Sequence, residues 1–225
     1  MLPKLLSERP ACAAKQVAGQ LCLDFANLTG GWQGIDAPRD DRLTQYGDLL
    51  AWAWRAGTLD GEATARLWDE ARRRPGEAEA VLRRARCLRN AIHALAFSLE
   101  RGSACREPDL DVLAQEARLA WSRRGLRSQR GRLAWRLEDD PRALDSPLWS
   151  VALSAEDYFT RADLTRLHSC PGEDCGWHFE DRTRNRSRQW CDMGDCGNVA
   201  KVRRFRARQR GRKRRVRGVR GQPRT

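Results

Sequence analysis

The chain has 225 residues, of which 40% are hydrophobic and 32% charged, with a formal net charge of +13; this fits one medium-sized folded domain and a small basic module. Its longest uninterrupted apolar run is Leu49–Trp54, whereas a membrane-spanning helix needs about 20 apolar residues. We therefore expect that this chain is not an integral membrane protein. The first 15 residues lack the hydrophobic stretch of a secretory signal, and we therefore expect a cytoplasmic protein.

The N-terminal part of the chain is predicted to be mainly helical. Residues 20–27 fit either a short strand or the start of a buried helix, and the glycines and proline of residues 28–41 predict a loop. Apolar residues then recur at helical spacing, which predicts helices over residues 43–56, 58–74, 77–100 and 108–117.

The hydrophobic period changes after residue 117. Leu133, Trp135 and Leu137 alternate with other residues, which predicts a strand over 132–137 that pairs with 119–121 in a β-hairpin. Residues 144–166 return to a helical pattern. The fold class is therefore predicted to be mainly α with a β-hairpin, an α+β N-terminal domain over residues 1–166.

The positive charge is concentrated at the C-terminal end. Residues 170–225 contain 17 basic and six acidic residues, and 13 basic residues but no acidic one follow Asp195. A confined basic block is typical of proteins that bind polyanions such as nucleic acids. A genome that favours arginine would raise the arginine content everywhere, but it would not remove acidic residues from one end.

Four of the eight cysteines form a C-x4-C-x15-C-x4-C pattern, namely Cys170, Cys175, Cys191 and Cys196. Thiols stay reduced in the cytoplasm, and two close cysteine pairs supply the four thiolates of a closed tetrahedral zinc site. The alternatives are four free thiols or a redox pair. His168 and His178 flank the first pair, and either could replace a cysteine, although four cysteines already complete the site.

The zinc segment is predicted to lead into a basic helix. Asn198 can cap a helix that starts near Val199, and Val199, Val202 and Phe205 recur at three-residue spacing, so we expect them to face the zinc core. Beyond residue 210 the chain is rich in glycine and arginine, which predicts a disordered arm over 211–225 that grips nucleic acid or stays solvated. The finger itself is assigned to residues 167–210.

The residues around the zinc segment resemble the CGNR zinc finger. The resemblance rests on the cysteine pairs, the run Asp181–Asn185, the step Trp190–Met193 and the final Cys196-Gly197-Asn198. Upstream, Leu21–Asn27 and Leu49–Trp52 resemble the ABATE domain. Together the two cover most of the chain. The family's closing arginine is replaced by Val199, and Gln189 stands where another arginine is common.

This resemblance implies a bacterial, stress-linked transcription regulator with a DNA-binding finger and a helical domain that senses a ligand. Two basic sets are then expected to contact duplex DNA. If residues 182–188 are extended, alternate arginines point toward one strand of phosphates, and the helix after the zinc site supplies the second set. The expected contacts are Arg182, Arg184, Arg186, Arg188, Lys201, Arg203, Arg204, Arg206 and Arg208. For each single arginine, the alternative is a solvated side chain or a pairing with a nearby carboxylate.

The ligand-sensing site is less defined by the sequence. Asp24 and Asn27 stand in an otherwise apolar stretch, and buried polar groups need partners. They are either part of a pocket for a small-molecule effector or the members of a helix cap or core hydrogen bond. His93 lies on the apolar face of the predicted helix over 77–100, as a core histidine would.

Three other functions compete with DNA binding. Zinc modules with arginine-rich tails also bind RNA or ribosomes. A zinc nuclease would need an open metal position, which four thiolates close, and HExxH does not occur, so we expect no enzyme. The finger could also be a thiol switch, because oxidation of its thiolates would release zinc.

Overall fold

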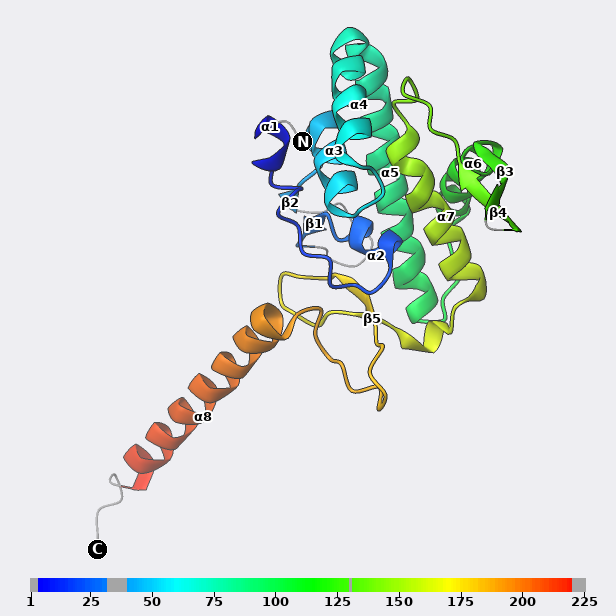
Figure 1. Ribbon diagram of the computed structural model, residues 1–225. Coiled ribbons are helices and arrows are strands. Elements are labelled where there is room, and N and C mark those ends of the chain that lie inside the picture. The colour runs from blue at the N-terminus through cyan, green and yellow to red at the C-terminus, as the bar shows by residue number, and fades with distance from the viewer. Residues whose placement is uncertain (1–3, 32–39, 130, 220–225) are drawn as a thin grey trace, which may run out of the picture.

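A computed structural model describes residues 4–31, 40–129 and 131–219 of the chain. A helical body carries a small C-terminal unit at one end, and a single long helix extends from that unit away from everything else (Figure 1). The body contains a short helix α1 (Lys4–Ser7) and six further helices: α2 (Leu21–Ala26), α3 (Tyr46–Arg55), α4 (Gly61–Arg73), α5 (Pro75–Glu100), α6 (Glu107–Ser122) and α7 (Ser146–Arg161). The predicted mainly helical fold is confirmed.

Helix α5 is the centre of the body, with the other long helices packed around it. Its residues Leu82, Leu88 and Ile92 are fully buried, and they share one core with residues of α2, α3 and α7. Phe25 of α2 packs against Trp52 of α3 with ring centroids 4.9 Å apart. Residues 20–27 thus form a buried helix rather than a strand, because their apolar side chains are covered on most sides.

Local capping sets where several of these helices begin. The Asp60 carboxylate accepts a hydrogen bond from the backbone N–H of Ala63 at 2.7 Å, so Asp60 caps α4, which begins at Gly61 and not at the predicted residue 58. Asp48 and Gln45 form a reciprocal capping box at the start of α3. Pro75 occupies the first turn of α5, where its missing N–H costs nothing.

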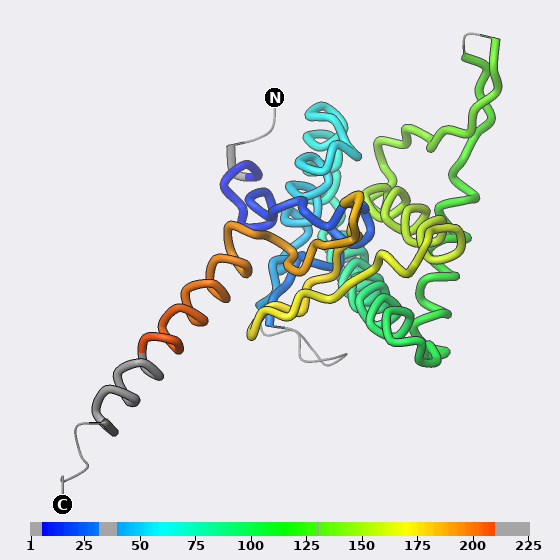
Figure 2. Tube along the Cα trace, turned by 90° about the horizontal axis from the view of Figure 1, so that it is seen from below, coloured from blue at the N-terminus to red at the C-terminus, as the bar shows by residue number. Residues whose placement is uncertain are grey.

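The strands form three separate antiparallel pairs. Strands β1 (Thr29–Gly30) and β2 (Asp40–Asp41) close the loop that leads to α3, and β3 (Arg124–Gln129) pairs with β4 (Arg132–Leu137) in a hairpin. The hairpin projects from the body on the side away from the long C-terminal helix (Figure 2). The predicted strand at 119–121 is wrong, because those residues continue α6, and the glycine-rich segment after them is the strand itself.

The C-terminal unit packs against α2 and α5. It begins with the short helical turn η1 (Leu164–Arg166) and the paired strands β5 (Leu167–Ser169) and β6 (His178–Glu180). Asn27, at the end of α2, bonds to both polar backbone groups of His178: its amide donates to the carbonyl at 2.8 Å, and its oxygen accepts from the N–H at 3.0 Å. Body and C-terminal unit are thereby joined through buried, specific hydrogen bonds.

Helix α8 (Asn198–Val219) leaves the C-terminal unit directly after the turn η2 (Met193–Gly197). Beyond its first turns, no other described element lies alongside α8 (Figure 1). The prediction of a disordered arm from residue 211 is wrong for 211–219, which continue the helix, because arginine and lysine are good helix formers. Residues 220–225 lie outside the described part of the chain. Among the described residues, no helix has both the length and the apolar sequence needed to cross a membrane.

We expect Asn27→Ala to destabilise the protein, because the substitution leaves the backbone N–H and carbonyl of His178 buried without partners. Each orphaned buried group costs about 1–3 kcal/mol, so the free energy of unfolding should fall by about 2–6 kcal/mol. Thermal or denaturant unfolding measures this loss. Gln189→Ala, at an exposed position of the C-terminal unit, is the control that should leave stability unchanged. An Asn27→Ala protein as stable as the control would contradict this role.

Candidate metal centre and nucleic-acid interface

The four cysteines of the C-terminal unit converge on one point. The sulfur atoms of Cys170, Cys175, Cys191 and Cys196 all lie within 4.8 Å of one another. Cys191 Sγ is 3.5 Å from Cys175 Sγ and 3.7 Å from Cys196 Sγ. A tetrahedral zinc site with zinc–sulfur bonds of about 2.3 Å has sulfur–sulfur edges of about 3.8 Å. The cluster therefore fits a closed zinc-binding site.

The first cysteine pair sits on the turn between β5 and β6. The Cys170 N–H donates to the Trp177 carbonyl at 2.7 Å, and the Cys175 N–H donates to the Gly172 carbonyl at 3.1 Å, which folds the connection into a tight loop. A Cβ atom at Gly172 would lie 3.0 Å from both Cys175 Cβ and Cys196 Sγ. Only glycine permits this close approach of the loop to the sulfur atoms.

The second cysteine pair lies at η2: Cys191 precedes this turn and Cys196 is part of it, and α8 follows directly. The Asp192 carboxylate accepts a hydrogen bond from the Gly194 N–H at 2.7 Å and so caps this turn. Cys196 lies inside the turn, and α8 begins two residues later at Asn198. The fourth sulfur therefore lies at the base of the long basic helix.

The electrostatics of the cluster favour a bound cation. Hydrogen bonds from the Cys175 and Cys191 thiols lower the pKa of Cys170, while the shared hydrogen bonds with Cys170 raise the pKa of Cys175 and Cys191. One thiolate is thus stabilised by its neighbours, but further thiolates beside it are disfavoured by like charge. A metal cation supplies the charge that lets all four sulfurs ionise together.

The arginines between the cysteine pairs do not form the predicted extended row. Residues 183–186 form a turn, and Arg186 has a positive φ of 51°. Arg186 donates to Thr165 Oγ1 at 3.0 Å and pairs with Asp163 at 3.1 Å. The side chains of alternate arginines therefore do not point to one side, because the segment is not an extended strand but bends along the surface of the unit. Arg182 pairs with Glu180, and Arg184 is exposed with no ion-pair partner among the described residues.

Arg188 has a structural role. It donates to the backbone carbonyls of Val17 and Cys191 at 2.6 and 2.5 Å, and its guanidinium lies over the Phe179 ring at 4.4 Å. These contacts join the N-terminal segment, the second cysteine pair and the small apolar core of the unit. The expectation that Arg188 lies free to contact phosphates does not match this half-buried position.

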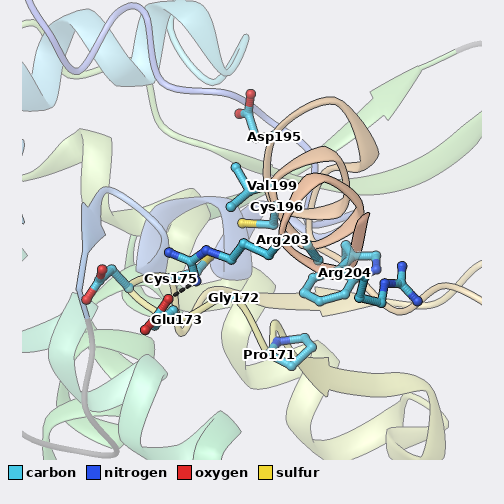
Figure 3. A pocket seen from close by; sticks show the side chains of 12 residues that line it. Pro171, Gly172, Glu173, Cys175, Asp195, Cys196, Val199, Arg203 and Arg204 are labelled. Carbon is cyan, nitrogen blue, oxygen red and sulfur yellow. Dashed lines mark ion pairs between the residues drawn. The ribbon is translucent and has the colours of Figure 1, made fainter. Parts of the chain in front are cut away.

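The basic residues of α8 are presented to solvent. All residues from 201 to 209 are exposed, which leaves Lys201, Arg204, Arg206 and Arg208 accessible. Arg203 instead forms an ion pair with Glu173 on the first cysteine loop. Figure 3 shows this pair across a cavity of about 680 Å³ between the loop and the first turns of α8.

The apolar residues of α8 do not cover the metal site. Val199, Val202 and Phe205 are 51%, 39% and 62% exposed, so the expectation that they face the zinc core is wrong. The helix projects outward, and the core under the cysteines is supplied by Phe179, with Trp177 and Trp190 packed at its edge.

The two residues proposed to line a ligand pocket are engaged inside the fold. Asp24 accepts a hydrogen bond from the Ala18 N–H at 2.9 Å, and its burial raises its pKa to about 6. Asn27 forms the reciprocal bonds to His178 described above. The geometry thus favours core hydrogen bonds, the second of the two interpretations, over an effector pocket at these residues.

A buried chain of polar side chains connects α5 to the C-terminal unit. His178 Nε2 lies 3.0 Å from His93 Nδ1, and His178 Nδ1 lies 3.2 Å from Ser169 Oγ, which also bonds to Glu100. Both ring nitrogens of His178 are therefore used, and His178 does not point to the sulfur cluster as a metal ligand. His93 is buried in the core, as predicted.

One important contact was missed by sequence reasoning. Lys15 Nζ lies 2.6 Å from Asp192 and 2.7 Å from Asp195, so the N-terminal segment neutralises the two acids between Cys191 and Cys196. These pairs also raise the pKa of Lys15. A lone lysine about 180 residues before its partners gives no local pattern that would have revealed the contact.

The fold and the cysteine cluster together define a zinc-finger protein with a helical N-terminal domain. Two family models match the chain. The CGNR zinc finger matches residues 166–209, and the ABATE family, described as "Putative stress-induced transcription regulator", matches residues 19–162. The chain therefore belongs to the ABATE family, and neither description is that of an enzyme family. A search of the curated proteins finds no match.

We expect the buried His178 to make stability depend on pH. Burial, followed by the neighbouring His93, lowers the pKa of His178 well below its usual value of 6.5. The folded state therefore binds a proton at His178 less readily than the unfolded state. The contribution of His178 to the free energy of unfolding is fully present above about pH 6.5 and is lost as the pH falls below that value.

The measurement is the melting temperature between pH 7.5 and 5.5 with zinc in excess, for the wild type and for His178→Gln. The wild type should lose more stability on acidification than the variant. His168→Gln, in the adjacent strand, should keep the wild-type slope. Parallel curves for wild type and His178→Gln would show that His178 does not carry the effect.

Proposed function

We propose that this protein is a zinc-dependent transcription regulator that binds duplex DNA through α8 and the surface of its zinc finger. The observation that carries the proposal is the long helix α8, which projects from the unit and whose residues 201–209 are all exposed and include five cations and no acid. A helix of this kind matches the width and charge of the DNA major groove. The stress link of this function rests on the family description alone.

Each part of the unit has a role in this proposal. The zinc site holds the start of α8, because Cys196 lies two residues before the helix. The ion pair of Arg203 with Glu173 links the helix to the first cysteine loop, but both side chains are exposed, so the pair is weak. Arginine or lysine contacts to phosphates position a protein on the duplex. We assign these contacts to Lys201, Arg204, Arg206 and Arg208, with Arg184 on the neighbouring turn.

The arginines that already have partners enter the proposal differently. Arg182 and Arg186 lie in exposed ion pairs, and such pairs are weak, so both can exchange their carboxylates for phosphates. Arg188 stays in place, because it holds backbone carbonyls inside the unit. The DNA-binding surface is therefore smaller than the full set of basic residues in the sequence.

The affinity for duplex DNA should fall steeply with salt. Five phosphate contacts give a slope of about −4.5 in log K against log salt concentration, measurable by fluorescence anisotropy with a labelled duplex. Arg208→Gln should reduce the magnitude of the slope by about 1. Arg161→Gln, which removes an exposed arginine of α7 in the body, is the matched control and should keep the wild-type slope.

Competition with structured RNA separates this function from RNA binding. The proposal requires unlabelled duplex DNA to displace the labelled duplex better than a structured RNA of equal charge. A slope that Arg208→Gln leaves unchanged, or preferential displacement by RNA, would contradict it.

A further inference from the structure

The large apolar side chains that are exposed in the described part of the chain lie in two regions. Ten large apolar side chains are exposed among the described residues; six lie on α6 and the β3–β4 hairpin, and the other four lie on η2 and α8. On α8 these are Val199, Val202 and Phe205, spaced three residues apart. At 3.6 residues per turn they cover an arc of about 120° along one side of the helix.

A partner of this apolar side of α8 must accommodate cationic side chains as well as apolar ones. Cations lie within and beside it on the same helix: Arg206 falls inside the arc, between Val199 and Val202, with a side chain long enough to extend past the apolar residues, and Lys201 borders Phe205. An apolar protein groove would have to bury these cations, which is costly unless each is paired. The occupant must therefore be anionic around its edges and apolar at the line of contact.

The DNA major groove has this combination. Phosphates line both of its edges, and each thymine presents an apolar C5-methyl group on its floor. Lys201, Arg204 and Arg208 lie on the remaining circumference of α8, in position to reach the phosphates when the apolar side faces the bases. Phe205 is 62% exposed, so its ring is available without any rearrangement of the helix.

A polar side chain on the same arc, that of Gln209, strengthens the fit to the DNA major groove. Gln209 is exposed and lies one turn after Phe205. Glutamine can bond to both N6 and N7 of adenine, and the thymine methyl group belongs to the same base pair. Phe205 and Gln209 can therefore contact an A·T step together, the phenylalanine at a methyl group and the glutamine at an adenine edge.

We propose that α8 reads thymine C5-methyl groups through Val202 and Phe205, so that the preferred DNA sites of this protein contain A·T pairs at the centre of the contact. Val199, at the first turn of the helix, extends the apolar side toward the finger. This inference rests on the proposed DNA-binding function and adds the chemistry by which the helix distinguishes bases.

The test uses the full-length, zinc-loaded protein and duplexes selected from a random pool. Each selected duplex is compared with a copy in which deoxyuridine replaces thymidine, which removes only the methyl groups. Burying one methyl group contributes about 0.8 kcal/mol, so the uridine duplex should bind about four-fold more weakly for each methyl contacted. Phe205→Ala should bind both duplexes with the same salt dependence as the wild type but with a smaller difference between them.

Two further variants keep the test specific. Phe205→Met retains a large apolar side chain and should keep much of the preference for thymidine. Arg208→Ala should weaken binding to both duplexes equally, because phosphate contacts carry no base information.

Equal affinity of the wild type for the two duplexes, with salt-dependent binding intact, overturns this inference and leaves the proposed function standing. Absence of salt-dependent duplex binding contradicts the proposed function itself. Binding of the wild type to anionic phospholipid vesicles in place of duplex DNA, lost in Phe205→Ala, overturns the inference in favour of a membrane surface.

Discussion

The convergence of four sulfur atoms within 4.8 Å is the constraint on which the C-terminal unit depends. Four thiolates this close repel one another, and the unit around them has an apolar core of few side chains. Small modules of this kind bury too little surface to fold unaided, whereas structural zinc contributes about 10–16 kcal/mol in finger peptides. A cation bound at this site would therefore supply much of the order of the unit and of the helix that starts beside it.

Polar contacts of several kinds hold the zinc finger to the helical body. Asn27 bonds to the backbone of His178, Lys15 pairs with the two acids between Cys191 and Cys196, and Arg188 reaches the Val17 carbonyl. Because most of these groups are buried or paired, the finger has one defined orientation on the body. Helix α8 then projects from a rigid base, which suits a helix that must enter a groove as a unit.

This arrangement also suggests how the body could influence the finger. The chain from Glu100 through Ser169 and His178 to His93 begins and ends on α5, the central helix of the body. A shift of α5 would disturb the strands β5 and β6, which carry the first cysteine pair at their turn. The polar chain thus provides a physical connection between the two family-defined regions of the protein.

Local patterns in the sequence located most helices of the body and grouped the four cysteines, but they placed a strand at 119–121, where α6 continues, and were insufficient for contacts between distant segments. Helical spacing located α5, and the C-x4-C-x15-C-x4-C pattern identified the four ligands, because both depend on residues close in sequence. Arg188 was misjudged because one of its partners, Val17, lies far away in the chain, and the two interpretations of Asn27 stayed open because its partner, His178, is also distant. The expectation for Val199, Val202 and Phe205 failed because it assumed that apolar residues face the nearest core, while α8 leaves the unit altogether.

Hydrogen exchange of the full-length protein before and after removal of zinc tests the central claim most directly. With four zinc-binding thiolates as the organising centre, the native protein should contain one equivalent of zinc. Chelation should remove amide protection from residues 167–209 while the helices α3 to α7 stay protected. The Cys191→Ser variant should resemble the chelated protein. A wild-type finger that keeps its protection without metal would contradict the account, since it would show that packing alone holds the four sulfurs and the base of α8 in place.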